Sequence, residues 1–168
     1  MNDSNGLHLL ARHNRWANQR LYEALEAFSL QGQTEVGFDP LAPMRRMLNH
    51  IRVIGLVWQA HLTARPHGFT ERIPADVPSL AELKVAQSEL DHWYEQYVDM
   101  LAPAGFEERI RFTFIGGGAG EMSRLEILLH VSTHNSYHRG FIAQLLYDAG
   151  SRPPTMDLPV FVRDGSAI

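Results

Sequence analysis

Apolar residues recur at helical intervals in several long stretches of the chain. Within residues 3–28 they stand three, four or seven positions apart, as Leu7, Leu10, Ala17, Leu21, Leu25 and Phe28. This spacing places them on one face of an α-helix. A second helix is expected over about residues 43–65, because Pro43 costs no hydrogen bond at a helix start and Pro66 ends the pattern.

Two capping boxes predict where two further helices begin. In Ser79-Leu-Ala-Glu82 and in Ser123-Arg-Leu-Glu126, the serine side chain can accept from the backbone amide of the glutamate, whose carboxylate can reach back. We expect the third helix to stop before Pro103. The fourth should run to about Ala149, with Gly150 as its C-cap.

Between the third and the fourth predicted helix, the spacing of apolar residues changes from helical to alternating. Residues 109–114 place Ile110, Phe112 and Phe114 on one side of the chain, which is typical of a short strand. The sequence GGGAG that follows is interpreted as the turn of a small hairpin, since it lacks the lysine of a phosphate-binding loop. The apolar cluster at residues 158–162 is expected to fold back onto the helices. The pattern predicts one all-α domain over residues 1–168, a four-helix bundle with a small β-hairpin before the last helix.

Composition excludes several classes of partner and chemistry. The 168 residues carry a formal net charge of -4 without a basic cluster, so no nucleic-acid partner is expected. No apolar run is long enough to cross a bilayer, and the first residues lack the pattern of a secretory signal, so we expect a cytoplasmic protein without a membrane partner. The chain has no cysteine but nine histidines, so any metal must be held by imidazole, carboxylate or backbone oxygen.

Two histidines share one face of the fourth predicted helix. His134 and His138 in THNSYHRG differ by about 40° around a helix axis. The same stripe holds Ile127, Val131, Phe141 and Leu145, so both imidazoles should point into the bundle. Arg139 lies off this face. Its alternatives are to hold a substrate carboxylate or to form a surface salt bridge, and the salt bridge is favoured.

His50 repeats this arrangement on the second helix, among Met47, Ile54, Val57 and Trp58. A buried polar group without a partner costs roughly 1–3 kcal/mol, and three inward imidazoles can avoid this cost together by binding one divalent cation. Three histidines with an open position are a known catalytic arrangement. The alternative remains that each is a core histidine bonded to a carbonyl or hydroxyl, because two histidines four residues apart also occur by chance.

The other histidines rank lower as ligands. His130, one turn before His134, is either a fourth ligand, a residue supporting the ligands or a core residue, and the last two are favoured. His61 lies about 16 Å of helix from His50, too far to bind the same ion. The remaining four are expected on the surface: His8, His13, His67 and His92.

Three stretches resemble the DinB-like family: HNRWANQRLYEAL at residues 13–25, MLNHIRVIGLVWQAHL at 47–62, and LLHVSTHNSYHRGFIAQLLYDAG at 128–150, followed by PPTMDLPVF. The resemblance implies an up-down-down-up bundle, usually a homodimer, with a divalent ion held by His50, His134 and His138. Phe141 departs from the family pattern, which has a polar residue, often glutamine, at this place. The departure leaves the three ligands intact.

Family members with an assigned reaction often activate a low-molecular-weight thiol at the metal. The resemblance therefore implies a metal-dependent transferase with a small thiol and an electrophilic substrate as its partners, and with Zn, Ni, Fe or Mn as its cofactor. The alternatives are a metal-dependent hydrolase and a non-catalytic bundle that binds a metal or a small molecule. No residue is assigned a catalytic role from the sequence.

Overall fold

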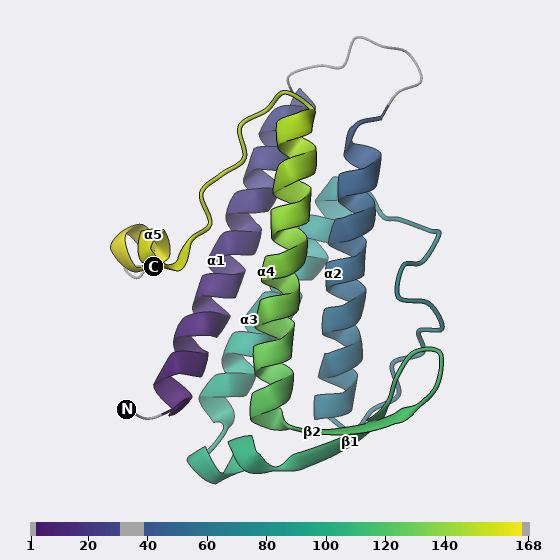
Figure 1. Ribbon diagram of the computed structural model, residues 1–168, viewed down its shortest axis with the longest axis vertical. Helices are drawn as coiled ribbons and strands as arrows, with labels where there is room; N and C mark the ends of the chain where they lie inside the picture. The colour runs from purple at the N-terminus through teal and green to yellow at the C-terminus, as the bar shows by residue number, and fades with distance from the viewer. Residues whose placement is uncertain (1–2, 31–38, 166–168) are drawn as a thin grey trace.

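Four long helices make up most of the molecule. The computed structural model describes residues 3–30 and 39–165, and the helices are α1 (Asp3–Leu30), α2 (Leu41–Leu62), α3 (Leu80–Met100) and α4 (Arg124–Asp148) (Figure 1). The predicted all-α bundle is confirmed, and both capping boxes are formed. The predicted second helix is shifted, since α2 begins two residues before Pro43 and ends at Leu62. No helix in the described part of the chain is long and apolar enough to cross a membrane.

The helices run up, down, down and up, as contacts between them show. Arg15 of α1 pairs with Glu95 of α3, and Glu26 further along α1 pairs with Lys84 at the start of α3, so these two helices are antiparallel. Gly55 and Leu62 of α2 accept hydrogen bonds from Tyr94 and Tyr97 of α3, so this pair is parallel. Residues 63–79 carry the chain back along the bundle between α2 and α3 (Figure 1).

A two-stranded antiparallel hairpin closes one end of the bundle. A 3₁₀ turn, η1 (Pro103–Glu107), leads into β1 (Arg109–Thr113), which pairs with β2 (Ala119–Ser123). Gly116, Gly117 and Gly118 all have positive φ, which glycine adopts without strain, and the predicted hairpin is confirmed. The last segment, α5 (Leu158–Val160) and η2 (Phe161–Gly165), returns to α1, where Phe161 packs on Trp16.

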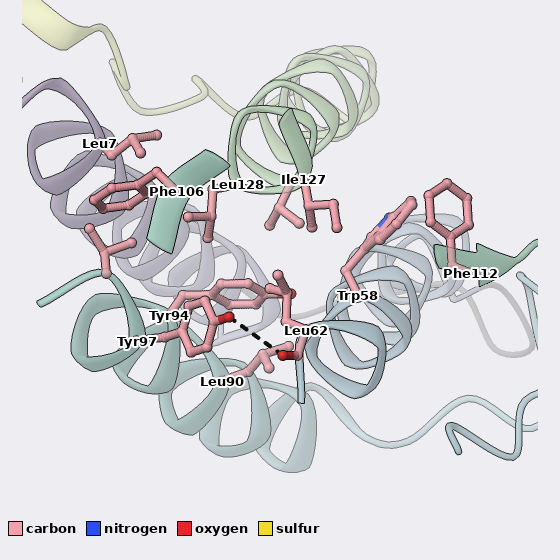
Figure 2. Packing of buried hydrophobic residues seen from close by; sticks show 12 residues of the cluster. Leu7, Trp58, Leu62, Leu90, Tyr94, Tyr97, Phe106, Phe112, Ile127 and Leu128 are labelled. Atoms are coloured by element: carbon pink, nitrogen blue, oxygen red, sulfur yellow. Dashed lines mark hydrogen bonds between the residues drawn. The ribbon is translucent and has the colours of Figure 1, made fainter. Parts of the chain in front are cut away.

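The core consists of two apolar clusters. The cluster at the hairpin end includes Leu7, Trp58, Tyr94 and Val131, and Figure 2 shows it with the hydrogen bond from Tyr97 to the Leu62 carbonyl. The cluster at the other end is built from Leu21, Tyr22, Leu25, Met44, Leu48, Ile51, Leu83, Ile142 and Leu146. Buried polar residues lie between the two clusters or at their adjoining edges on every long helix: Asn14, Asn18, His50, Gln87, Asp91, Asn135 and Arg139.

The apolar face predicted for α4 is partly wrong. Phe141, predicted to point inward, is 51% exposed, whereas Leu128, Ile142 and Leu146 are buried. The inward face is turned towards Asn135 and Arg139, two polar residues that the apolar pattern did not include.

Gly55 marks a close approach of α2 to α3. A Cβ atom built at Gly55 would stand 2.8 Å from Cδ2 of the buried Leu90. Gly140 also lies inside a helix, but apart from its own helix backbone and chain neighbours no described residue comes within 4 Å of its Cβ position. The two glycines therefore separate the effect of close packing from that of helix propensity.

We expect Gly140→Ala to stabilise the protein by about 0.5–1 kcal/mol, because alanine restricts the unfolded chain and favours the helix. In Gly55→Ala the same gain is opposed by overpacking against Leu90, which typically costs about 1–3 kcal/mol, so a net loss of about 1 kcal/mol is expected. Urea denaturation of the two variants measures both values. Equal stabilisation by the two substitutions would contradict the packing role of Gly55.

Candidate metal centre

The structure brings the three predicted histidines together at mid-height in the bundle. His50 of α2 faces His134 and His138 of α4, with ring centroids 5.0 and 4.6 Å apart, and the two α4 rings are 4.5 Å apart. One ring nitrogen from each residue lies within 4.8 Å of the other two, so the group can hold a metal ion. Among the described residues, no fourth side chain joins it.

A backbone carbonyl sets the orientation of His50. Nδ1 of His50 lies 2.8 Å from the carbonyl oxygen of Arg72, in the segment that returns from α2 to α3. A carbonyl only accepts, so Nδ1 carries the proton and Nε2 of the neutral ring keeps its lone pair. Histidines that bind metals are commonly held by such a contact.

Two of the nitrogen atoms have the spacing that a shared cation would require. Nε2 of His50 and Nε2 of His134 are 3.2 Å apart, close to the spacing of about 3.3 Å between two imidazole nitrogens on a tetrahedral ion. Burial, followed by the neighbouring His138 and His50, lowers the pKa of His134 to about 3, so this ring is neutral near pH 7. Nδ1 of His134 is buried with no hydrogen-bond partner in the described residues. A cation bound by both Nε2 atoms would replace the direct contact of 3.2 Å between them.

The three histidines form one part of the wall of a cavity of about 440 Å³. Its other lining residues come from α2, from α4, from the returning segment and from the hairpin: Ile54, Val57, Trp58, His61, Arg72, Phe112, Thr113, Phe114, Ile115 and His130. His130 packs on Trp58 and lines the cavity, and it is not part of the group of three histidines that could hold a metal ion. His61 contacts the rings of Trp58 and Phe112.

The prediction that Arg139 lies on the surface is wrong. The residue is 3% exposed, and its Nη1 donates to Oδ1 of Asn14 at 2.6 Å and to Oδ1 of Asn18 at 2.9 Å. Arg139 is absent from the lining of the cavity, so it has no direct contact with a molecule bound there. Although burial lowers its pKa to about 10, the guanidinium remains charged near pH 7.

Asp91 of α3 is the buried counter-charge. Nδ2 of Asn18 donates to both of its carboxylate oxygens, at 3.0 and 2.8 Å, and Nε2 of Gln87 donates at 2.9 Å. Asn14 adds a longer contact of 3.3 Å. The two asparagines accept from Arg139 and donate to Asp91, so their amides bridge the opposite charges between α4 and α3.

This polar network fixes the rotation of α4. Asn135 and Arg139 directly follow His134 and His138, so each is turned by about 100° from its neighbour. Because the network holds Asn135 and Arg139 against α1, the two histidines face α2. The sequence contained a signal for the network in three polar pairs spaced four residues apart: Asn14 and Asn18, Gln87 and Asp91, Asn135 and Arg139.

The remaining histidines lie away from the cluster. His13 was expected on the surface, but it is half-buried, with Nε2 2.8 Å from the Met156 carbonyl oxygen. His67 packs beside His61. His92 is exposed, as expected.

Comparison with known proteins identifies a family. The sequence profile described as the DinB family matches residues 1–164, which is nearly the whole chain. No curated protein matches the chain.

The buried carboxyl of Asp91 predicts a pH dependence of stability. Burial raises its pKa to about 6, against the opposing hydrogen bonds from Asn18 and Gln87 and the charge of Arg139. Between about pH 4 and 6 the folded protein therefore binds more protons at this site than the unfolded chain, so its contribution to stability falls as the pH rises. The advantage of the wild-type protein over Asp91→Asn in free energy of unfolding should shrink by up to about 3 kcal/mol from pH 4 to pH 7.

Urea denaturation at several pH values in this range measures the difference. Asp148→Asn is the control, because it removes an exposed carboxyl at the end of α4. A difference between wild type and Asp91→Asn that stays constant with pH would show that Asp91 keeps an ordinary pKa.

Proposed function

The chain belongs to the DinB family, and from this premise we propose that it is a metal-dependent enzyme that activates a low-molecular-weight thiol for transfer to an electrophile. His50, His134 and His138 would hold the divalent cation. The observation that carries the proposal is the convergence of three ring nitrogens at the wall of a cavity of about 440 Å³. A structural zinc site would normally be closed by four protein ligands, whereas this group has three.

A divalent cation bound there would act as a Lewis acid and lower the pKa of a coordinated thiol. The chain has no cysteine, so the thiol must come from a second substrate. The backbone carbonyl of Arg72 keeps His50 in the tautomer that presents a lone pair to the cation. The network of Asn135 and Arg139 keeps the other two rings turned towards it.

The lining of the cavity favours thiol transfer over hydrolysis. None of its lining residues is an aspartate or a glutamate, so the usual carboxylate base for activating water is missing from it. A thiolate is itself the nucleophile and needs no base once it is formed. Hydrolysis remains the second candidate, because the imidazoles of His61 and His130 line the same cavity and could accept a proton.

The metal is proposed to be Zn, Ni, Fe or Mn, of which the first three suit imidazole ligands best. We also propose a homodimer, as the family resemblance implies. Tyr137 and Phe141 share a face of α4 and are each more than half exposed, and a second copy would cover these two rings. A cytoplasmic location stays a prediction.

We expect His50→Ala and His134→Ala to weaken metal binding by more than about 100-fold, because changing a residue that merely supports the ligands already costs roughly 10–100-fold. Competition titration with a chromophoric chelator measures the affinity. His92→Ala is the matched control, since it removes an exposed imidazole outside the group and should bind as the wild type does. Wild-type affinity in both site variants would exclude the proposed ligands.

The activity is tested by loading the protein with Zn, Ni, Fe or Mn and following the loss of several small thiols in the presence of a model electrophile. Turnover should require both the metal and the thiol, and chelation or His134→Ala should abolish it. A parallel screen of esters and amides without thiol separates the two reactions. Turnover in that screen alone would favour hydrolysis, and no turnover with any metal and thiol would contradict the transferase.

A further inference from the structure

The cavity beside the three histidines is long and has two different ends. His50, Ile54, Val57, Trp58 and His61 line it from one helix, and His50 and His61 are separated by about 16 Å along α2. His50, His134 and His138 therefore lie at one end of the cavity. Beyond it the wall becomes apolar and aromatic, with Trp58 of α2 meeting Phe112 of the hairpin.

The aromatic end is a packed assembly of rings. Trp58 and Phe112 meet edge to face at 4.8 Å, and Phe112 and Phe114 meet in the same way at 5.0 Å. Such geometry is the favoured one for aromatic pairs. Trp58 also contacts His130 at 5.2 Å, and His130 lies next to the ligand His134. The rings therefore extend from the hairpin to the ligand group without a break.

Gly120 gives Phe112 its place in this wall. The two residues are paired across the hairpin, and a Cβ atom at Gly120 would stand 2.6 Å from the ring of Phe112. The ring of Phe112 thus lies over the backbone of Gly120 on one side and contacts Trp58 on the other. Any side chain at position 120 would displace the ring, so the hairpin sequence determines the shape of this end of the cavity.

The charges around the cavity also limit what can bind. Of its lining residues, Arg72 alone carries a formal charge when the histidines are neutral, and none is acidic. A cationic group would lose its hydration here without gaining a carboxylate partner. A neutral group meets no such penalty, and an anionic group can offset it by pairing with Arg72.

We infer that the electrophilic substrate carries a planar apolar group, aromatic or conjugated, that lies against Trp58 and Phe112, and that it is neutral or anionic. The inference rests on the proposed function, since it assumes that the reacting end of the substrate lies at the three histidines. The β1–β2 hairpin then determines specificity, through Phe112 and through the absence of a side chain at Gly120.

Hydroxamates that share a metal-binding group and differ in their tails test this inference. Visible spectra of the protein loaded with Co(II) would report binding of propanohydroxamate, of 3-phenylpropanohydroxamate and of the same phenyl compound bearing a trimethylammonium group. The phenyl compound should bind at least about tenfold more tightly than propanohydroxamate, because its ring is removed from water. The cationic compound should lose this advantage.

The ratio of the affinity for 3-phenylpropanohydroxamate to that for propanohydroxamate should fall to about one in Phe112→Ala. It should be reduced in Gly120→Ala, which keeps the phenylalanine but displaces its ring. Phe69→Ala is the control, because Phe69 stacks on His67 outside the cavity lining and should leave the ratio unchanged. Binding of propanohydroxamate with wild-type affinity verifies that each variant is folded. If Phe112→Ala fails this check, Gly120→Ala decides, and an unchanged ratio in it would overturn the inference.

If the wild-type protein binds 3-phenylpropanohydroxamate and propanohydroxamate equally well, or binds the trimethylammonium compound more tightly than the phenyl compound, the inference is overturned and the metal centre stays intact. No spectral response to propanohydroxamate in the wild-type protein would instead overturn the metal centre, and the substrate inference with it. The two failures are therefore distinguishable in one set of titrations.

Discussion

Two opposite charges buried in the middle of the bundle constrain the whole arrangement. Removing Asp91 and Arg139 from water costs roughly several kcal/mol per ion, and hydrogen bonds of good geometry to both charged groups offset this cost. Asn14 and Asn18 supply that geometry by accepting from the guanidinium and donating to the carboxylate. Three helices are tied together at one height, and a small rotation of any of them would break several hydrogen bonds at once. The position of the histidines on α4 is a consequence of this constraint.

The fold thus separates two tasks between neighbouring faces of α4. One face, with Asn135 and Arg139, joins the helix to α1 and is closed to solvent. The next face, with His134 and His138, lines the cavity that α2, the returning segment and the hairpin complete. The apolar clusters on the two sides of the polar layer contain most of the buried apolar residues, while the layer determines how the helices are aligned. The histidines of the candidate site and the residues that orient them are therefore adjacent in sequence but lie on different faces of α4.

Much of the fold and of the site could be predicted because the signals are local. Capping boxes and helical spacing depend on residues within one or two turns, and the inward direction of His50 and His138 follows from their apolar neighbours. The role of Arg139 could not be found in this way. A charged residue is normally assigned to the surface, and the partners that make its burial tolerable lie on α1, 121 and 125 positions away. The complementary rule, which assigns apolar residues to the interior, placed Phe141 inward. In the structure Ile142 is the buried residue.

The parallel course of α2 and α3 has a chemical result of its own. A chain that has reached the hairpin end must travel the length of the bundle before α3 can begin, and residues 63–79 make this journey across the outside of α2. Within this segment, the backbone carbonyl oxygen of Arg72 accepts a hydrogen bond from His50. Surface connections ordinarily accept insertions and deletions between related proteins. Here a change in length would shift the oxygen that selects the tautomer of a candidate ligand, so this linker should be as restricted in evolution as the helices it joins.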